Sequence, residues 1–328
     1  MKKFTGITIG NPSGIGPEVS IRAVQSLISQ SYDFYPVLIG DISVLKRNME
    51  MLKERFSLEK WDIAARPEKT KIYYVSPGII KNDDFITGKD NRLSGKASYE
   101  YFNLGWDMLK EKKISCLVTA PVSKASWQMA GIKFQGHTEA LKYFSGENVE
   151  MLMVAGRLKV LLITTHVPLK KIWDIISMDR IYDSTIKTVL FLRKFFTGSK
   201  ERLGLCGLNP HAGESGYLGN EEKEILTPAI KKLEGAGMHV EGPLPSDVIF
   251  RNAIKNKCFD LIIALYHDQA LIPLKTFFFD KLVNVSVSLN WLRTSPGHGT
   301  GYDIAYKGRA NPSSMIEAIK LAVKLSKI

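Results

Sequence analysis

Short apolar runs alternate with amphipathic stretches along nearly the whole chain, and this alternation constrains the fold more than any other feature. Apolar runs of this length are typical of buried strands, and the stretches between them have helical periodicity. The alternation predicts an α/β fold with a mainly parallel sheet. The expected strands are 4–9, 35–39, 71–75, 114–119, 202–208 and 261–265, and the expected helices are 17–29, 41–55, 92–113, 169–176, 179–196, 220–234 and 313–328, with a further helix opening at 136–139.

One segment departs from the parallel plan. Residues 151–155 and 158–165 are apolar runs joined by Gly156 and Arg157, which predicts a hairpin and therefore an antiparallel patch. The length of 328 residues fits two domains or one large α/β unit. No linker is evident in the sequence, so any domain boundary is inferred from topology.

The chain is basic, with a formal net charge of +12 and a pI near 9.4. An excess of this size is found in nucleic-acid-binding proteins, but here the basic residues are spread out, without one dense block or interleaved aromatic residues. The pattern favours solvated, lysine-rich helix faces, or steering of a small anionic substrate, over a nucleic-acid partner.

The sequence also indicates in which cell compartment the protein is expected. No apolar run approaches the roughly 18 residues of a membrane span, and the first ten residues lack the apolar core of a signal peptide. Three cysteines, Cys116, Cys206 and Cys258, are far apart and lie in or beside apolar runs. This favours reduced thiols in a cytoplasmic protein with no membrane partner.

Residues 11–18 form the junction between the first expected strand and helix. Pro17 suits the first helical position, and Glu18 suits the positive end of the helix dipole. With Gly14 and Gly16 in the turn, such a junction can receive a phosphate or a cofactor. A tight turn with no ligand remains an equal alternative.

Residues 261–303 carry the densest set of reactive groups. His267 and Asp268 follow an apolar run, and Lys275, Asn284 and Arg293 are spaced through otherwise apolar sequence. The segment closes on a glycine-rich run at 298–303. Together these groups indicate a metal-assisted site for a small anion.

The six histidines divide by position. His166, His211 and His267 each follow an apolar strand, and the carboxyl edge of an α/β sheet is where ligands bind. Three imidazoles at that edge suit Zn²⁺ or a similar ion, although any one of them alone is more readily structural. His137, with Thr138, begins a helix and either binds an anion or caps the helix. The remaining two are His239, expected to be structural or exposed, and His298, in the glycine-rich run.

Four motifs surround these histidines: Gly136-His137-Thr138-Glu139, Thr164-Thr165-His166-Val167-Pro168-Leu169, Gly207-Leu208-Asn209-Pro210-His211-Ala212-Gly213-Glu214 and Tyr266-His267-Asp268-Gln269. Together they resemble the 4-hydroxythreonine-4-phosphate dehydrogenase family of pyridoxal phosphate biosynthesis. The resemblance runs from Ile7 to the C-terminus, and the glycine motifs at both ends are also similar to those of the wider isocitrate and isopropylmalate dehydrogenase superfamily.

The resemblance implies two α/β/α domains around a cleft, in a homodimer whose subunits share the active sites. The expected division is a cofactor-side domain of residues 1–120 plus 278–328, and a metal, substrate and dimerisation domain of residues 121–277. Two departures stand out: Asn11 replaces the usual Asp before Pro12, and Asn290-Trp291 replaces a common Pro-Phe.

The resemblance also implies roles for individual residues. The metal ligands are His166, His211 and His267. The substrate contacts are His137, Thr138, Lys275, Asn284 and Arg293, the last three near the phosphate. The cofactor contacts are Gly14, Gly16, His298, Gly299, Asp303 and Asn311. Asp247 and Asp268 are candidate catalytic carboxylates, with helix capping or solvation as the alternative.

The implied activity is oxidation of 4-phosphohydroxy-L-threonine with NAD or NADP and a divalent metal, Zn²⁺ favoured over Mg²⁺ or Co²⁺. A His₃ site adds no negative charge, so the ion keeps its Lewis acidity. Asp303 stands five residues after His298, where the superfamily's ribose-binding Asp favours NAD; the alternative is that Asp303 only caps the turn into Ile304 and Ala305. Two alternatives remain: a paralogue acting on 4-phospho-threonate or 4-phospho-erythronate, and a sugar-phosphate-binding regulator without turnover.

Overall fold

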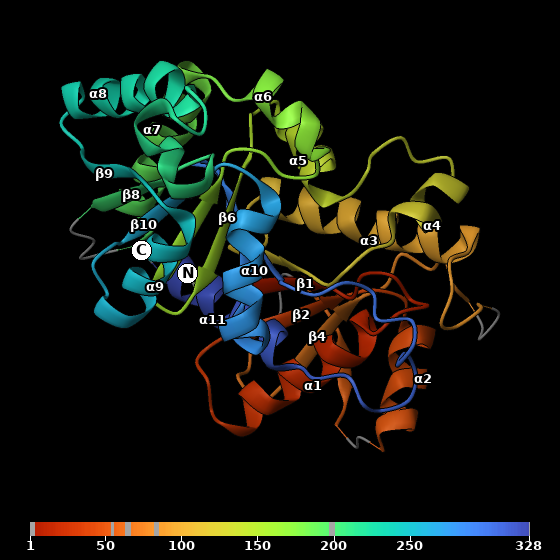
Figure 1. The fold of residues 1–328 in the computed structure, drawn as a ribbon. Helices are drawn as coiled ribbons and strands as arrows, with labels where there is room; N and C mark the ends of the chain where they lie inside the picture. The colour runs from red at the N-terminus through yellow and green to blue at the C-terminus, as the bar shows by residue number, and fades with distance from the viewer. Residues whose placement is uncertain (1–3, 54–55, 63–66, 82–84, 197–200, 328) are drawn as a thin grey trace. The chain divides into compact units, whose positions relative to one another are not determined.

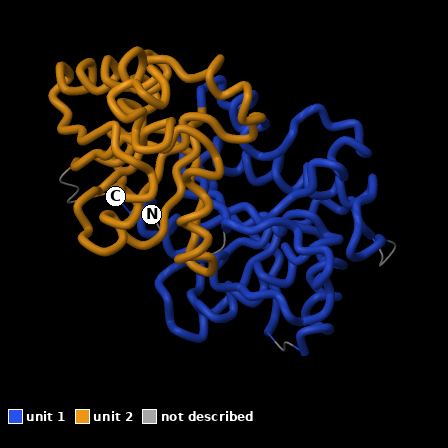
Figure 2. The backbone as a smooth tube through the Cα atoms, in the orientation of Figure 1, with its two compact units in different colours: residues 1–148, 290–328 blue, residues 149–289 orange. Residues whose placement is uncertain are grey.

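The computed structural model describes residues 4–53, 56–62, 67–81, 85–196 and 201–327. The chain divides into two compact units (Figure 2), and unit 1 comprises Met1–Asn148 with Asn290–Ile328, whereas unit 2 comprises Val149–Leu289. Both units are α/β, as the alternation of apolar and amphipathic segments predicts (Figure 1). Within the described residues, no helix is long and apolar enough to cross a membrane.

Unit 1 is built on a parallel sheet in the order β3-β4-β2-β1-β5-β12. Its helix α3 packs against β1 and β5, and α11 packs against β12 and β5. The strands are β1 (Phe4–Thr8), β2 (Tyr35–Ile39), β3 (Leu58–Lys60), β4 (Ile72–Val75), β5 (Cys116–Thr119) and β12 (Arg293–Pro296). The helices are α1 (Gly16–Ser29), α2 (Ile42–Leu52), α3 (Arg92–Lys110), α4 (Lys124–Met129), α5 (His137–Ser145) and α11 (Ser313–Ser326).

Unit 2 is a mixed sheet in the order β11-β6-β7-β10-β8-β9. The first two pairings, β11 with β6 and β6 with β7, are antiparallel, and the rest are parallel. Its strands are β6 (Glu150–Ala155), β7 (Leu158–Leu162), β8 (Arg202–Cys206), β9 (His239–Leu244), β10 (Leu261–Ala264) and β11 (Val283–Val287). Its helices are α6 (Ile172–Ile175), α7 (Met178–Phe195), α8 (Thr227–Gly235), α9 (Ser246–Asn256) and α10 (His267–Phe278), with short turns η1 (Leu169–Lys171), η2 (Pro210–Gly216), η3 (Glu222–Leu226) and η4 (Phe279–Lys281).

The predicted strands and helices agree closely with the structure, and local chemistry explains where they begin. The hairpin at Gly156 and Arg157 is confirmed as β6 and β7. The predicted helix at 92–113 begins after Asn91, whose side chain accepts a hydrogen bond from Ser94 N and so caps α3. Residues 54–55 and 328, at the ends of two predicted helices, lie outside the described residues.

Other parts differ from the prediction. Helix α4, which begins at Lys124, was not predicted, and the predicted helix at 220–234 is a π-helical turn, η3, followed by α8. Strands β9, β11 and β12 and helices α9 and α10 were not predicted as elements. β9 was missed because it alternates little and is largely exposed, so its sequence lacks an apolar run.

The unit boundaries also differ from the predicted domain boundaries at 120/121 and 277/278. Residues 121–148 belong to unit 1 because α4 packs on α3, where Trp127 Nε1 donates to Ser98 Oγ at 2.9 Å. Residues 278–289 belong to unit 2 because β11 pairs with β6. Both segments are therefore placed by a tertiary partner that lies far away in sequence.

Candidate active site

Three histidines follow three neighbouring parallel strands of unit 2. Strand β10 pairs in parallel with both β7 and β8, so the carboxyl ends of all three lie at one edge of the sheet. His166 comes shortly after β7, His211 shortly after β8 and His267 begins α10 directly after β10. The sheet therefore places all three histidines at the same edge, where α/β proteins bind ligands.

The structure brings two of these histidines into contact. The ring centroids of His166 and His267 are 5.6 Å apart, and both residues line a pocket of about 330 Å³. Tyr266 and Asp268 also line this pocket. His267 Nδ1 lies 2.7 Å from Asp268 Oδ1, and a carboxylate on Nδ1 leaves the imidazole Nε2 lone pair available to a metal.

His211 lies in an unusual left-handed turn. Residues 211–215 all have positive φ angles, and His211 itself has φ of 52°. Non-glycine residues in this region are strained, so the surrounding structure must hold them there. No group of three His, Cys, Asp or Glu side chains close enough to hold a metal is found within the described part of the chain.

Glu222 holds the start of this turn. Its Oε1 accepts hydrogen bonds from Leu208 N at 2.9 Å and Asn209 N at 2.8 Å, and its Oε2 accepts one from Asn209 Nδ2 at 3.0 Å. A Cβ atom at Gly213 would lie 2.6 Å from Glu222 Oε2, so a larger residue there would displace this carboxylate. Glu222 could not be predicted from the sequence, because its role depends on a tertiary contact with this turn.

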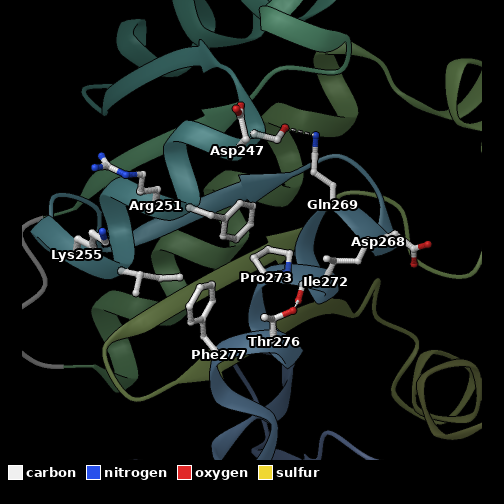
Figure 3. A pocket seen from close by; sticks show the side chains of 12 residues that line it. Asp247, Arg251, Lys255, Asp268, Gln269, Ile272, Pro273, Thr276 and Phe277 are labelled. Carbon is white, nitrogen blue, oxygen red and sulfur yellow. Dashed lines mark hydrogen bonds between the residues drawn. The ribbon is translucent and has the colours of Figure 1, made fainter.

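The candidate catalytic carboxylates lie on two adjacent helices. Asp247 is exposed in the first turn of α9, and Asp268 is exposed in the first turn of α10. Both line a second cavity of unit 2, of about 510 Å³ (Figure 3). The neighbouring Gln269 joins the two helices, because its Nε2 donates to Ser246 Oγ and to Gly207 O while its Oε1 accepts from Leu265 N.

The predicted phosphate contacts fall on both units. Lys275 is exposed on α10, and Asn284 is half-buried on β11, both in unit 2. Arg293 begins β12 in unit 1 and is 2% exposed. Its guanidinium donates to Thr119 Oγ1 through Nε at 3.0 Å and Nη2 at 2.6 Å, a partner that the sequence did not reveal.

His137 lies near Arg293 in unit 1. It is the first residue of α5, next to Thr138, and its ring packs against Phe102 and Trp127 at centroid distances of 5.1 and 5.6 Å. Burial and, secondarily, the charge of Arg293 hold the pKa of the His137 imidazole well below its usual value. Its Nε2 atom is buried and has no hydrogen-bond partner among the described residues. A neutral imidazole with an unused ring nitrogen is therefore present beside a buried cation.

The first glycine turn packs against the closing glycine loop within unit 1. Ile15 N donates to Thr300 O at 2.9 Å, and a Cβ at Gly14 would lie 2.6 Å from that same oxygen. A Cβ at Gly16 would lie 2.3 Å from Ile9 O. Residues 11–20 are all buried, so both glycines have a packing role in addition to any contact with a ligand.

The other predicted cofactor residues are more open. Asp303 is exposed, and its backbone carbonyl accepts from Lys307 Nζ at 2.6 Å. A Cβ at Gly299 would meet nothing within 4 Å, which leaves open space above this backbone. His298 Nδ1 lies 3.1 Å from Gly299 O, and Asn311 Oδ1 accepts from Ser313 N at the start of α11.

The departures from the family pattern have identifiable contacts. Asn11 is fully buried and accepts a hydrogen bond from Ser13 N at 2.9 Å, while its Nδ2 has no partner in the described structure. Asn290 donates to Glu147 Oε1 at 2.7 Å, and the ring of Trp291 packs edge-on against Trp106 at 5.3 Å.

Comparisons with known proteins find relatives that are named dehydrogenases. The chain is 37% identical over 326 residues to a 4-hydroxythreonine-4-phosphate dehydrogenase from Sulfurihydrogenibium sp., covering 98% of each protein. It is 35% identical over 335 residues to a "Putative D-threonate 4-phosphate dehydrogenase" from Oceanobacillus iheyensis, covering 99% of the chain and 98% of that protein.

Solved structures of named dehydrogenases also match the chain. A 4-hydroxythreonine-4-phosphate dehydrogenase from Klebsiella pneumoniae matches with a TM-score of 0.87 and 30% identity, covering 100% of this chain and 99% of that one. An isocitrate dehydrogenase from Methylococcus capsulatus, at 12% identity and a TM-score of 0.50 over 99% of this chain and 85% of that one, shares the fold alone. The predicted isocitrate dehydrogenase-like fold class is therefore confirmed.

The family itself is shown by a family model. The model described as pyridoxal phosphate biosynthetic protein PdxA matches residues 33–322. The dehydrogenase names of the relatives identify an oxidoreductase and imply a nicotinamide cofactor and a small phosphorylated substrate, which sets aside the regulator without turnover. The chain belongs to the PdxA family of pyridoxal phosphate biosynthetic proteins.

Proposed function

We propose that this protein oxidises 4-phosphohydroxy-L-threonine to 2-amino-3-oxo-4-phosphooxybutanoate, using NAD and a divalent metal ion. The product is a ketone β to a carboxylate, and it loses CO₂ to give 3-amino-2-oxopropyl phosphate. The observation that carries the proposal is the contact between His166 and His267 at the carboxyl edge of the unit 2 sheet, in a chain whose relatives are named dehydrogenases.

The metal would be held by His166, His211 and His267. Two observations support this role: imidazole nitrogens suit Zn²⁺, and Asp268 contacts Nδ1 of His267 in the way that orients a ligating imidazole. Within the described part of one chain only His166 and His267 are in contact, and the three histidines do not form one cluster. When bound, the ion would lower the pKa of the substrate hydroxyl and so favour loss of its proton. Asp268 then has a positioning role, and Asp247 is the candidate proton-transfer group.

The substrate phosphate would be bound by Arg293, Lys275 and Asn284. A guanidinium offers two parallel N–H donors to a phosphate, and Thr119 fixes the orientation of the one in Arg293. The neutral His137 and Thr138 would contact the remainder of the substrate. Because the His137 imidazole carries no charge, it offers a hydrogen bond without adding to the positive charge of Arg293.

The dinucleotide would lie against the loop that carries His298, Gly299, Asp303 and Asn311. The open space above Gly299 supports close approach of a ligand to the backbone. The exposed carboxylate of Asp303 can accept hydrogen bonds from free ribose hydroxyls and repels a 2′-phosphate, so NAD is expected to be preferred to NADP.

A homodimer is part of the proposal, and the face between α9 and α10 is its proposed interface. Apolar side chains are exposed on this face: Val248 by 42%, Ile272 by 64% and Phe277 by 64%. The same face carries Asp247 and Asp268 together with Arg251 and Lys255 (Figure 3). An apolar patch with both charge signs can pair with a second copy of itself, as a twofold interface requires. Ile272→Asp should convert a dimer to a monomer in light scattering.

A cytoplasmic location completes the proposal. None of Cys116, Cys206 and Cys258 forms a disulfide in the described structure, and the substrates of the named relatives are phosphorylated metabolites. Reduced thiols are typical of proteins in the cytoplasm.

D-threonate 4-phosphate is the second candidate substrate. The two curated relatives with the two names are 37% and 35% identical to this chain, so overall similarity favours neither strongly. The two substrates differ in the group on C2, an ammonium in one and a hydroxyl in the other. The deciding experiment compares kcat/KM for NADH formation with 4-phosphohydroxy-L-threonine and with D-threonate 4-phosphate, after metal loading. A higher value for D-threonate 4-phosphate would overturn the first assignment and leave the dehydrogenase chemistry intact.

A further inference from the structure

Asp90 gathers three hydroxyl groups from distant parts of unit 1. Its Oδ1 accepts hydrogen bonds from Ser126 Oγ at 2.8 Å, from Tyr302 OH at 2.7 Å and from Ser123 Oγ. Ser123 and Ser126 are buried at the start of α4, and Tyr302 is half-buried in the loop beyond β12. Asp90 therefore joins the 298–303 loop to the helical layer that carries α4.

The carboxylate is the form of Asp90 that this arrangement favours. Burial acts to raise its pKa, but the hydrogen bonds from Ser123, Tyr302 and Ser126 together hold the pKa below its usual value. All three hydroxyls donate, as an ionised acceptor requires. Hydrogen bonds to an ionised group are stronger than those between neutral groups, so we expect the hydrogen bond from Tyr302 to Asp90 to be a strong one.

The loop has a second anchor on the other side of Asp303. Tyr306 OH donates to Pro12 O at 2.8 Å and accepts from Asn48 Nδ2 at 3.1 Å. Tyr306 has φ of 58°, a left-handed conformation that a bulky residue adopts only when its surroundings enforce it. Asp303 is thus an exposed residue between two tyrosines whose hydroxyls are both fixed to the body of unit 1.

An anchored loop binds a ligand more tightly than a mobile one. Ordering a loop on binding costs conformational entropy, and a loop that is held in place before binding avoids that cost. No contact between Asp90 and the dinucleotide is needed for this effect. Losing the Tyr302 anchor should therefore weaken dinucleotide binding without changing the chemical step.

We infer that Asp90 is a positioning residue of the dinucleotide site, acting through Tyr302 to hold His298 and Asp303 in their binding positions. The inference rests on the proposed assignment of the 298–303 loop to the dinucleotide. It concerns binding affinity and loop order, and it assigns no role to Asp90 in hydride transfer.

The test uses Tyr302→Phe, Asp90→Ala, Asp90→Asn and the double variant Tyr302→Phe/Asp90→Ala in the full-length protein. The matched control is Tyr32→Phe, which also removes a half-buried hydroxyl in unit 1, one that donates to Lys320 O at 3.4 Å. Three quantities are measured: the dissociation constant for NAD by calorimetry, kcat at saturating NAD, and hydrogen exchange of residues 297–306 without ligand.

The Tyr302→Phe and Asp90→Ala variants should each weaken NAD binding by about tenfold, the effect of losing a hydrogen bond to a charged group. Their kcat should stay within about twofold of the parent, because the chemical groups are unchanged. The double variant should bind NAD with about the same affinity as the weaker-binding single variant, because both substitutions remove the same contact. Asp90→Asn keeps an acceptor oxygen and should fall between the parent and Asp90→Ala.

Hydrogen exchange separates this inference from the proposed function. If the parent binds neither NAD nor NADP, the proposed function fails, and faster exchange in 297–306 in the Tyr302 and Asp90 variants still supports the anchoring by Asp90. If the parent binds NAD, unchanged affinity in both single variants overturns the inference. A lower unfolding midpoint with unchanged affinity and exchange would reduce Asp90 to a general structural role and would also overturn it.

Discussion

The guanidinium of Arg293 is held against Thr119, whose Oγ1 accepts two hydrogen bonds from it at 3.0 and 2.6 Å. Arg293 is 2% exposed and Thr119 is fully buried, and burial lowers the pKa of the guanidinium to about 9. A buried cation depends on each acceptor around it, because water cannot replace a missing one. Thr119 therefore sets the orientation in which Arg293 can meet a phosphate.

We expect Thr119→Val to impair binding of the phosphorylated substrate. The substitution keeps the shape of the side chain and removes the acceptor, which costs about 1–3 kcal/mol for a buried partner. The KM for the phosphorylated substrate should rise by about tenfold or more, with a smaller change in kcat. Thr119→Ser keeps the hydroxyl and is the control. Equal KM values in the Val and Ser variants would show that the hydrogen bonds do not matter.

Removing any of the three strand-end histidines should remove bound metal and turnover together. His166→Ala, His211→Ala and His267→Ala should each lower metal content, measured by mass spectrometry after dialysis, and reduce kcat by at least about a hundredfold. Circular dichroism should show that the fold is retained. His239→Ala, which removes an exposed imidazole on β9, is the matched control. Full activity of all three variants after chelation would contradict the metal assignment.

Asp303→Ala should shift cofactor preference toward NADP. The carboxylate would repel a 2′-phosphate and accept hydrogen bonds from ribose hydroxyls. Its loss should therefore lower the ratio of kcat/KM for NAD to kcat/KM for NADP by about tenfold. Asp107→Ala, which removes another exposed carboxylate of unit 1, controls for the change in net charge. A parent enzyme that prefers NADP, or an unchanged ratio in the variant, would refute the ribose contact.

His137 should make the protein less stable in mild acid. Its pKa is well below the usual value in the folded chain, so the unfolded chain binds more protons as pH falls through about 6.5. The unfolding free energy should therefore decrease with falling pH below about 6.5, by at most about 1.4 kcal/mol per pH unit from this group. His137→Gln should remove that part of the slope in urea unfolding between pH 5 and 8. The exposed imidazole of His239 provides the control substitution, His239→Gln.

The sequence predicts those features that depend on local pattern. Buried strands such as β2 and β10 are apolar runs, and the ends of neighbouring parallel strands must share an edge, so the positions of His166, His211 and His267 could be inferred. The edge strand β9 has no such run and could not be predicted.

Long-range contacts lie outside what the sequence can predict. Thr119 accepts hydrogen bonds from a residue 174 positions away in the chain. The partners of Glu222 are 13 and 14 positions away, and those of Asp90 are between 33 and 212 positions away. Nothing in the local sequence around these residues specifies such partners. The left-handed turn at 211–215 belongs to the same group, because its residue types alone do not favour positive φ.

The contact between Gly14 and Thr300 has a consequence for synthesis of the chain. Unit 2 is one continuous segment, but unit 1 needs residues 290–328 to complete its sheet and to cover its first turn. On the ribosome, unit 2 can close its core while unit 1 still lacks β12 and α11. The N-terminal part of unit 1 is therefore made before unit 2 but is protected after it. Pulse proteolysis of arrested chains ending at residue 289 should cleave unit 1 before unit 2, and the opposite order would contradict this folding sequence.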